Sequence, residues 1–433
     1  MDIGCILRMI PDSQTGMIHS MQKWKDYFFG VFYTDPREIG SLNGIRSLAI
    51  FMLFYVHLFR FLPNVDQSQG WLRNFLDNGS QSIDMFFVLS GFLISGPLMR
   101  QLDRKGTLDL KNFYLKRSLR IFPPYFIFCA IQYFVFIPAA AKWNPAYGEN
   151  SWRIIFDILY VSNYWHGTIF HGWSLSLEEQ FYLLFPFLLL LVFPRLGKRG
   201  RLAFLVTFTA IPLVFRAIYL YSVILAAPEA QHIDLYNKGI YYPFHGHYDS
   251  IFIGIILAYL YDNYRDWMNQ LFTNNVIFYS VQTVAWLGII AYSFLVFEFK
   301  TSIESMVIRF PLFSTLWALV MLTSMKEGTI INRLLSFKIY SPIAKLSYCA
   351  YLIHIAIMTP LIRKWFVERG EDGLPRFVYV QQWEVLPYSV VMGLIILGAA
   401  YLYHLVAERP FMILKEKYAG KQISFEKVQG AGS

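Results

Sequence analysis

Charged residues are scarce in this 433-residue chain: Asp, Glu, Lys and Arg together make 15% of it, whereas hydrophobic residues make 56%. A soluble domain is about one-quarter charged, so the composition excludes an ordinary soluble protein. Cys5, Cys129 and Cys349 lie far apart, which indicates neither a disulfide framework nor a paired-cysteine zinc site. The Walker, GxGxxG, GxSxG and HExxH motifs are also missing. We therefore expect no bound metal and no permanently bound cofactor.

The chain has instead a series of apolar runs of about 20 residues, each long enough to cross a hydrocarbon core of roughly 30 Å. They predict an all-α, polytopic transmembrane bundle of about ten spans. The expected spans are Leu42–Leu62, Ser82–Met99, Ile121–Ala139, Trp173–Phe193, Leu202–Leu225, Phe244–Tyr261, Asn275–Val296, Ile308–Met325, Ile343–Ile362 and Leu386–Val406. The shorter apolar run Trp152–Trp165 contains Asp157 and Asn163, so we expect it to lie at half depth or at the interface.

Lysine and arginine are concentrated on one side of these spans, as in the loops 100–120 and 194–201. Short loops rich in these residues stay cytoplasmic, so both termini are assigned to the cytoplasm. The expected organisation is a cytoplasmic arm at 1–40, a transmembrane domain at 41–411 and a cytoplasmic tail at 412–433. The tail closes with GAGS, which resembles a cloning remnant.

The basic balance of the chain, a formal net charge of +9, follows mainly from this loop bias. It favours attraction to anionic lipid headgroups, and no nucleic-acid partner is expected. In the N-terminal arm, Met17, Met21, Trp24 and Phe28 share one helical face, which predicts an interfacial helix. The arm lacks a secretory signal, so the first span is expected to direct insertion.

The first span carries two ionisable residues, Arg46 and His57, inside an otherwise apolar run. Eleven positions separate them, which places them within about 20° of one helical face and roughly 16 Å apart along the axis. Ionisable groups in spans usually face an interior cavity, so this pair predicts a functional site. For Arg60, snorkelling to the headgroups is the better explanation.

Other polar residues gather at two levels. On the cytoplasmic side, Arg117 and Arg120 share a face just before the third span and form a candidate anion site with Arg46. Ordinary positive-inside flanking would explain any one of these arginines equally well. On the outer side, Glu178 lies at about the depth of His57, where a carboxylate would fix the tautomer of a catalytic imidazole.

Three further polar features have simpler explanations. N-capping accounts for Ser174 or Asp84 without a functional role. Zinc binding by His245, His247 and Asp249 is disfavoured, because alternating positions on a helix point apart. His354, in the middle of the ninth expected span, is interpreted as a packing residue.

Seven motifs occur in the order found in one family of membrane enzymes. They are LNGIRSLAIFMLFYVH, SIDMFFVLSGFLIS, LKRSLRIFPPYF, WSLSLEEQFYLLFP, HYDSIFIGIILAY, AKLSYCAYLIH and VAERPF. With Arg-x10-His in the first and Arg-x-x-Arg in the third, the chain resembles the type-3 membrane acyltransferases. These are integral-membrane O-acyltransferases of bacterial polysaccharide and lipopolysaccharide modification. The resemblance extends over roughly residues 40–411.

The resemblance implies an acyl-CoA donor on the cytoplasmic side, with acetyl the commonest group, and an acceptor hydroxyl on a cell-surface or lipid-linked glycan. It also implies a multi-pass protein of the bacterial inner membrane that contacts membrane lipid. His57 matches the family's essential histidine, Arg46 its first-span arginine, and Glu178 the first carboxylate of its SxEEQFY box. Arg117 and Arg120 match its Arg-x-x-Arg.

Together these features predict that Arg46, Arg117 and Arg120 hold the phosphates of coenzyme A. His57 then acts as general base on the acceptor hydroxyl, supported by Glu178. An acyl-histidine intermediate is the alternative route, and both routes stay open. The acceptor is expected to contact four polar residues, which are Asp84, Ser176, Tyr182 and Asp249.

The chain departs from the family pattern at His247, where an arginine is common, and no C-terminal SGNH-type hydrolase domain is expected. Two other classes of protein are alternatives. A transporter of a glycan or lipid-linked solute should show inverted repeats with broken helices, and none is found. A scaffolding protein would not need Arg46 and His57 on one face.

Overall fold

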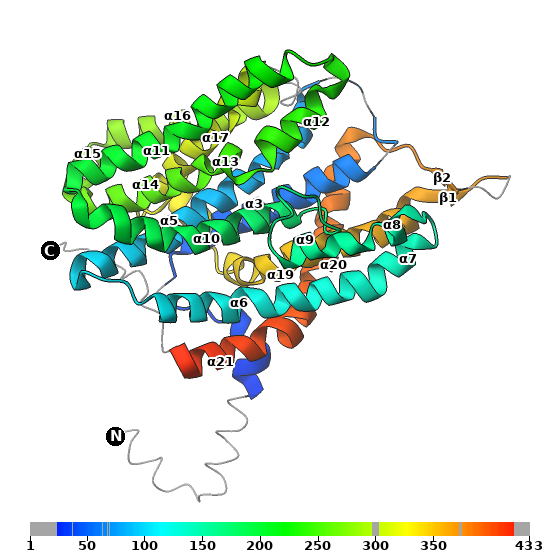
Figure 1. Ribbon diagram of the computed structural model, residues 1–433, viewed down its shortest axis with the longest axis horizontal. Helices are drawn as coiled ribbons and strands as arrows, with labels where there is room; N and C mark the ends of the chain where they lie inside the picture. The colour runs from blue at the N-terminus through cyan, green and yellow to red at the C-terminus, as the bar shows by residue number, and fades with distance from the viewer. Residues whose placement is uncertain are drawn as a thin grey trace, which may run out of the picture.

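The computed structural model describes residues 24–36, 38–62, 64–66, 68, 70–296, 303–371 and 375–419. Helices make up nearly all of it, and most of the long ones lie along the long axis of the view (Figure 1). Within the described residues, the strands are limited to a small antiparallel hairpin of β1 (Val367–Arg369) and β2 (Pro375–Phe377). The predicted all-α class is confirmed.

Nine helical stretches of the described chain are long and apolar enough to cross a membrane. They are Gly40–Phe61, Trp71–Lys105, Leu110–Ala141, Gly172–Arg195, Lys198–Ile224, Asn275–Leu295, Ser305–Ser324, Tyr340–Phe366 and Gln382–Tyr418. Each corresponds to one of the ten expected spans.

Several of these stretches combine more than one helix. The α-helices within them are α3 (Gly40–Phe61), α4 (Trp71–Asn78), α5 (Ser82–Lys105), α6 (Leu110–Ile131), α7 (Ile137–Ala141), α10 (Gly172–Val192), α11 (Lys198–Tyr219), α16 (Asn275–Leu295), α17 (Ile303–Ser324), α19 (Tyr340–Phe366), α20 (Val385–Tyr403) and α21 (Arg409–Ala419). Short helices connect them: α8 (Ala146–Glu149), α9 (Ile154–Ile158), α12 (His232–Tyr236), α13 (Phe244–His247), α14 (Asp249–Asn263), α15 (Arg265–Thr273) and α18 (Ile330–Leu335).

The expected span Phe244–Tyr261 differs from the other nine. It is divided between α13 and α14, and α14 has only 15 residues. This helix packs against α5, α11 and α17, so its apolar residues are covered by protein. The sequence pattern of a helix buried in a bundle is the same as that of a lipid-facing one.

Two glycines allow α14 to lie very close to α5. A Cβ atom on Gly91 would collide with the carbonyl oxygen of Ile251, and one on Gly254 would collide with that of Val88. Small residues at such crossings let two helix backbones approach in a membrane bundle. The contact brings the polar residues at the start of both helices together.

The third span begins earlier than expected. Gly106, in the left-handed region at φ 68°, ends α5, and the Asp109 side chain accepts a hydrogen bond of 3.0 Å from the Asn112 amide to cap α6. Because α6 already begins at Leu110, Arg117 and Arg120 lie within a continuous helix rather than just before it.

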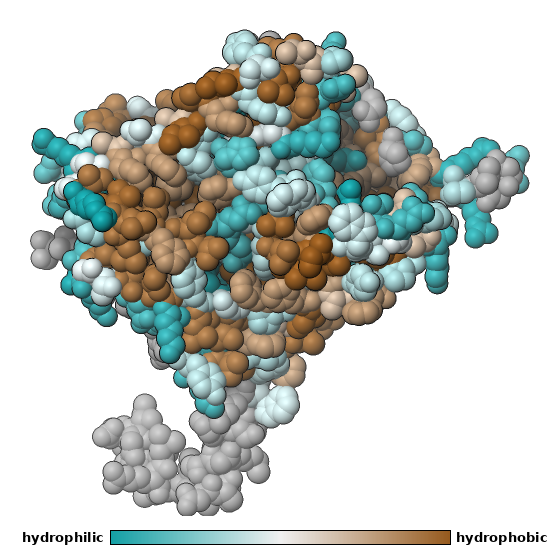
Figure 2. Space-filling view, in the orientation of Figure 1, coloured by the Kyte–Doolittle hydropathy of each residue, from teal (hydrophilic) through white to brown (hydrophobic). Residues whose placement is uncertain are grey.

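The outer surface suits an apolar solvent. Brown, hydrophobic side chains cover much of the face in Figure 2, and teal ones stand out at its left and right edges. Large apolar side chains such as Val214, Leu287 and Leu394 project outward from α11, α16 and α20. This distribution is typical of helices whose outward faces contact lipid.

The predicted N-terminal interfacial helix is described in part. Residues 24–29 are helical, and Trp24 stacks on Phe28 with ring centroids 5.7 Å apart. Met17 and Met21 lie outside the described residues.

Candidate active site

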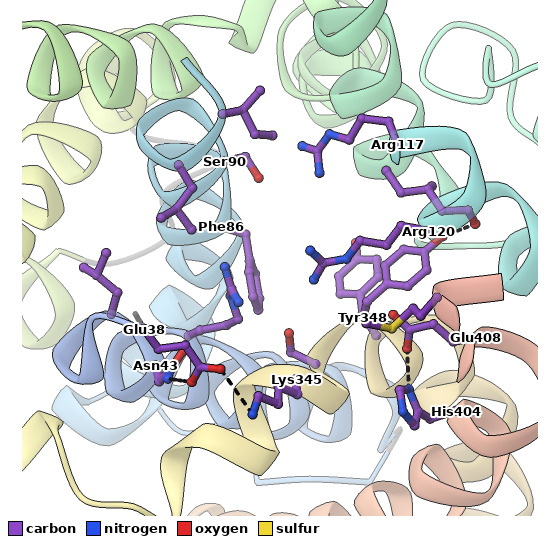
Figure 3. Close-up of a pocket in the computed structure, with 18 of the residues that line it drawn as sticks. Glu38, Asn43, Phe86, Ser90, Arg117, Arg120, Lys345, Tyr348, His404 and Glu408 are labelled. Carbon is purple, nitrogen blue, oxygen red and sulfur yellow. Dashed lines mark hydrogen bonds and ion pairs between the residues drawn. The ribbon is translucent and has the colours of Figure 1, made fainter. Parts of the chain in front are cut away.

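A cavity of about 1020 Å³ opens into the bundle between α3, α5, α6, α10, α19 and α21 (Figure 3). Protein pockets that hold small ligands span roughly 300 to 1000 Å³, so this cavity can take a nucleotide-sized molecule. The predicted residues Arg46, Arg117, Arg120, Glu178 and Tyr182 all line it. The structure therefore brings together five of the nine site residues that the sequence predicts.

Three of the four arginines that line the cavity lack an anionic partner among the described residues. Among the described residues, no hydrogen bond or ion pair is found for Arg46, Arg117 or Arg120, and the buried Nη2 of Arg117 is unsatisfied. Arg117 and Arg120 extend into the cavity from α6 in Figure 3. Unpaired guanidinium groups in a sheltered site favour an anionic ligand, because they form charge-assisted hydrogen bonds with phosphate or carboxylate.

Two other cations on the cavity wall are already neutralised or bound. Lys345 pairs with Glu38, with Nζ and Oε1 3.1 Å apart, and Arg409 donates to the Asp26 carbonyl at 2.9 Å. Arg46, Arg117 and Arg120, the arginine trio, therefore form a part of the wall that can bind an anion.

Glu178 lies on the same wall, and its carboxylate does not contact the His57 imidazole. Its carboxylate accepts a hydrogen bond from Ser90 Oγ, and Tyr182 Oη donates to the same hydroxyl at 3.4 Å. The Arg117 guanidinium lies 4.0 Å from the centroid of the Tyr182 ring. In the described part of the chain, the expected contact between Glu178 and His57 is not formed, because the partner of His57 is a second histidine.

His57 forms a hydrogen bond with His354, with Nδ1 and Nε2 3.0 Å apart. His354 Nδ1 lies 2.6 Å from the Tyr351 carbonyl, which can only accept, so this nitrogen carries the proton. In a neutral His354 ring, Nε2 is then the acceptor and His57 Nδ1 the donor. In a neutral His57 ring the lone pair is then on Nε2, which is the form that a general base requires.

A third buried imidazole packs against this pair. The ring centroids of His171 and His354 are 4.7 Å apart, and His171 Nε2 donates to the Leu352 carbonyl at 3.0 Å. His171 lies at the start of α10, where burial lowers its pKa well below the usual value and keeps it neutral. Among the described residues, its Nδ1 atom has no partner.

Two hydroxyls separate the cavity from the histidines. Tyr351 and Ser174 line the cavity, and each hydroxyl lies within hydrogen-bond distance of the other and of the His171 carbonyl, which accepts. Tyr351 also supplies the carbonyl that holds His354. Tyr351 therefore connects the cavity to the pair formed by His57 and His354.

Asp84 and Asp249 lie elsewhere, in a buried cluster between α5, α11, α14 and α17. Asp84 accepts from Ser250 Oγ and contacts His247 Nε2, each at 3.0 Å, and Asp249 pairs with Arg216 at 2.7 Å. Neither aspartate lines the cavity. In an apolar bundle each carboxylate needs a nearby cation, so both have a structural explanation, and the acceptor contacts predicted for them gain no geometric support.

Ser176 is also buried away from the cavity, with its hydroxyl 2.9 Å from Ser162 Oγ. The disfavoured zinc arrangement is not formed, since His245 contacts Tyr164 Oη at 3.2 Å while His247 and Asp249 face other partners. Of the four predicted acceptor residues, Tyr182 is the one on the cavity wall.

Comparison with protein families identifies the chain. An acyltransferase domain family matches residues 39–405, which is most of the sequence. This chain belongs to that family. The predicted resemblance to the membrane acyltransferases is thereby confirmed, and the apolar helices together with the family make the chain an integral membrane protein.

Proteins similar to this chain have names that refer to acetyl transfer. The O-acetyltransferase OatA of Staphylococcus aureus strain NCTC 8325 is 25% identical over 368 residues, which cover 80% of this chain and 54% of OatA. A protein of strain COL with a provisional O-acetyltransferase name is 24% identical over 365 residues, with the same coverage. The chain spans about half the length of these curated relatives. No solved structure matches it.

The residue that sequence reasoning missed in this acyltransferase is His354. Its signal was present in the motif AKLSYCAYLIH, one of the seven that carry the resemblance. A mid-span histidine is ambiguous by itself, and only the fold shows that α19 places it beside His57 of α3.

Proposed function

We propose that this chain is a membrane O-acyltransferase that moves an acyl group, most simply acetyl, from cytoplasmic acyl-CoA to a hydroxyl of a cell-surface or lipid-linked glycan. The bacterial inner membrane is the compartment that suits this reaction, because donor and acceptor lie on opposite sides of it. The observation that carries the proposal is the arginine trio in one cavity, whose inner end lies beside the pair formed by His57 and His354.

The donor end of the reaction is assigned to the arginine trio. Arg117 and Arg120 bind the phosphates of coenzyme A, and Arg46 adds a third guanidinium on the facing helix α3. Forked guanidinium groups suit phosphate oxygens better than lysine does. The pantetheine arm then runs along the cavity toward Tyr351 and Ser174.

The chemical step is assigned to His57. As the acceptor oxygen attacks the thioester carbonyl, His57 Nε2 takes the hydroxyl proton, the C–S bond breaks and the coenzyme A thiolate leaves to be protonated. His354 holds the required tautomer. An acyl-histidine route would use the same nitrogen as nucleophile, so both routes depend on this lone pair.

The acceptor is assigned to the side of His57 that faces away from the cavity. Phe61 stacks on the His57 ring with centroids 5.7 Å apart, and the exposed Phe170 meets it edge-on at 6.0 Å. Apolar ring faces of this kind pack against the C–H faces of sugars while the hydroxyl reaches the base.

The donor assignment is tested by direct binding of acyl-CoA to purified protein. The double variant Arg117→Ala with Arg120→Ala should weaken binding by more than about 10-fold, because each lost charge-assisted contact is worth roughly 1.5 to 3 kcal/mol. Arg195→Ala is the matched control, since Arg195 is an exposed arginine at the end of the stretch Gly172–Arg195 and lies outside the cavity. Unchanged affinity in the double variant would remove both arginines from the donor site.

The acceptor side is tested in cells. Mass spectrometry of surface glycans, with and without the gene, should show the loss of one acyl ester. Identical glycan acylation in both strains would contradict the proposed acceptor class.

A further inference from the structure

Three potential metal ligands meet at the edge of the cavity, and they are outside the groups used in the proposed reaction. Cys349 Sγ lies 3.1 Å from Glu408 Oε2, and His404 Nδ1 lies 2.7 Å from the same oxygen. The three ligand atoms are all within 4.8 Å of one another, and all three residues are buried.

Two elements far apart in the sequence form this cluster. Cys349 comes from α19, and the other two residues come from the π-helical turn His404–Glu408 between α20 and α21. π-helical turns are rare and often occur at functional sites. Cys349 and Glu408 are 59 positions apart, so no local motif could reveal them, and the expectation of no metal rested on local motifs alone.

The donor set has a definite chemical preference. Thiolate, imidazole and carboxylate together suit Zn²⁺ and related divalent transition metals, whereas Mg²⁺ and Ca²⁺ prefer oxygen ligands alone. Three protein ligands with a fourth open position are typical of sites where the metal meets a substrate.

The open position has access to the cavity. His404 and Glu408 both line it, and Figure 3 shows them on the same side of the cavity as Arg120. An ion can therefore enter through the cavity, and an anionic oxygen of a bound molecule can reach it.

We propose that Cys349, His404 and Glu408 bind one divalent ion of the zinc class, whose open coordination position faces the cavity. Binding replaces the two hydrogen bonds of the cluster. The thiol releases its proton to solvent, the His404 proton moves from Nδ1 to Nε2 so that Nδ1 can ligate, and the three ligand atoms take up spacings of about 3.4 Å around the ion. The ion clips α19 to the turn between α20 and α21. The ion also adds positive charge beside Arg120 for the donor phosphates, a role that rests on the proposed function.

The test uses the full chain in detergent, untagged and stripped with a chelator. A Cys5→Ser background leaves Cys129 and Cys349 as the cysteines. Titration with Co²⁺ should give one equivalent bound and a thiolate-to-cobalt charge-transfer band. Zn²⁺ competition then gives the affinity.

Cys349→Ser should abolish the band and weaken Zn²⁺ binding more than about 100-fold, since loss of a direct ligand exceeds the 10 to 100-fold cost of losing an outer-shell partner. Cys129→Ser is the matched control, because Cys129 is also buried but belongs to no cluster of potential ligands in the described chain. His404→Gln provides a second variant that keeps the thiol.

Well under one equivalent of Co²⁺, or a band that survives in Cys349→Ser, would overturn the metal site. If Cys349→Ser fails to elute as a single species, His404→Gln decides the matter by the same measurement. Acyl-CoA binding by stripped protein separates the two proposals: protein that binds acyl-CoA but no metal refutes the site alone, and protein that binds metal but no acyl-CoA refutes the donor assignment alone.

Discussion

At the scale of the residue, the chemistry depends on which nitrogen of His57 carries the proton. Two hydrogen bonds place that proton on Nδ1: His354 Nδ1 donates to the Tyr351 carbonyl, and His354 Nε2 then accepts from His57 Nδ1. In serine proteases a carboxylate has this orienting role. Here a neutral imidazole does so, which avoids placing an additional buried charge among apolar side chains.

The first prediction concerns His57 itself. His57→Ala should bind acyl-CoA nearly as well as the parent, because His57 does not line the cavity, but should lose acyl transfer by a factor of about 10² to 10⁴. His57→Gln should be equally inactive, because an amide cannot take a proton at neutral pH. The measurement is acyl ester on the acceptor at matched expression. Substantial transfer by His57→Gln would refute the general-base role.

The second prediction treats His354 as a positioning residue. His354→Phe keeps an aromatic ring but removes the acceptor for His57 Nδ1, so kcat should fall about 10²-fold while KM for acyl-CoA changes little. His354→Glu restores an acceptor and should recover at least part of kcat. If His354 only filled space, the buried charge of His354→Glu would be more damaging than the phenylalanine, and that order of activities would contradict the assignment.

The candidate site could be predicted from sequence only where its residues follow a helical pattern or a family motif. Arg46 with His57, and Arg117 with Arg120, are such pairs, and both arginines of α6 line the same cavity as Arg46. Partners on different helices leave no such pattern. Asp84 and His247 are 163 positions apart, so their mutual contact, which explains both residues structurally, follows from the fold alone.

At the scale of the element, the segment between α9 and α10 presents Phe170 and His171 to the histidine pair. Asp157 anchors it: its carboxylate accepts from the Thr168 amide at 2.6 Å and from the Ile169 amide at 3.2 Å. Burial raises the pKa of Asp157 to about 6, although these hydrogen bonds oppose the shift.

This shift gives a third prediction, with a defined sign. The pKa of Asp157 is raised above its unfolded value of about 3.9. Its contribution to stability is therefore fully present below about pH 4 and is lost as pH rises through about 6. Asp157→Asn removes this titration but keeps one acceptor. The stability of the variant relative to the parent should rise between pH 4 and pH 7, by an amount of order 2 to 3 kcal/mol.

Thermal unfolding in detergent across that pH range measures the difference, and comparison with the parent cancels the other titrating groups. Asp234→Asn is the control, because its carboxylate is exposed in a surface pair with Lys238. A difference between Asp157→Asn and the parent that stays constant with pH would contradict the raised pKa.

Helix prediction succeeded where length and hydropathy decide, and was incomplete where packing decides. The nine long apolar helices follow from their sequence because lipid accepts only such segments. The division of the expected span Phe244–Tyr261 into α13 and α14, and its close contact with α5 at Gly91 and Gly254, could not be predicted, because no periodicity reveals such a contact.

At the scale of the whole molecule, the two ends of the bundle differ. In Figure 1, α15 lies at the left end, whereas α7, α8 and the β1–β2 hairpin lie at the right. The loops rich in lysine and arginine are those at the end of α5 and the start of α11. Short loops rich in lysine and arginine stay cytoplasmic. The arginine trio can bind cytoplasmic acyl-CoA, as proposed, only if the side with these loops is the cytoplasmic one.

The last prediction tests this orientation with single cysteines. Lys105→Cys and Lys198→Cys should resist an impermeant thiol reagent in intact cells, and Asn144→Cys should be labelled, because the three positions are all exposed and differ only in side. The background is Cys5→Ser, and the buried Cys129 and Cys349 should stay silent. Permeabilised cells, in which all three positions should react, provide the control. Labelling at Lys105→Cys in intact cells would invert the topology, place Arg117 and Arg120 on the side that lacks acyl-CoA, and overturn the donor assignment together with the orientation.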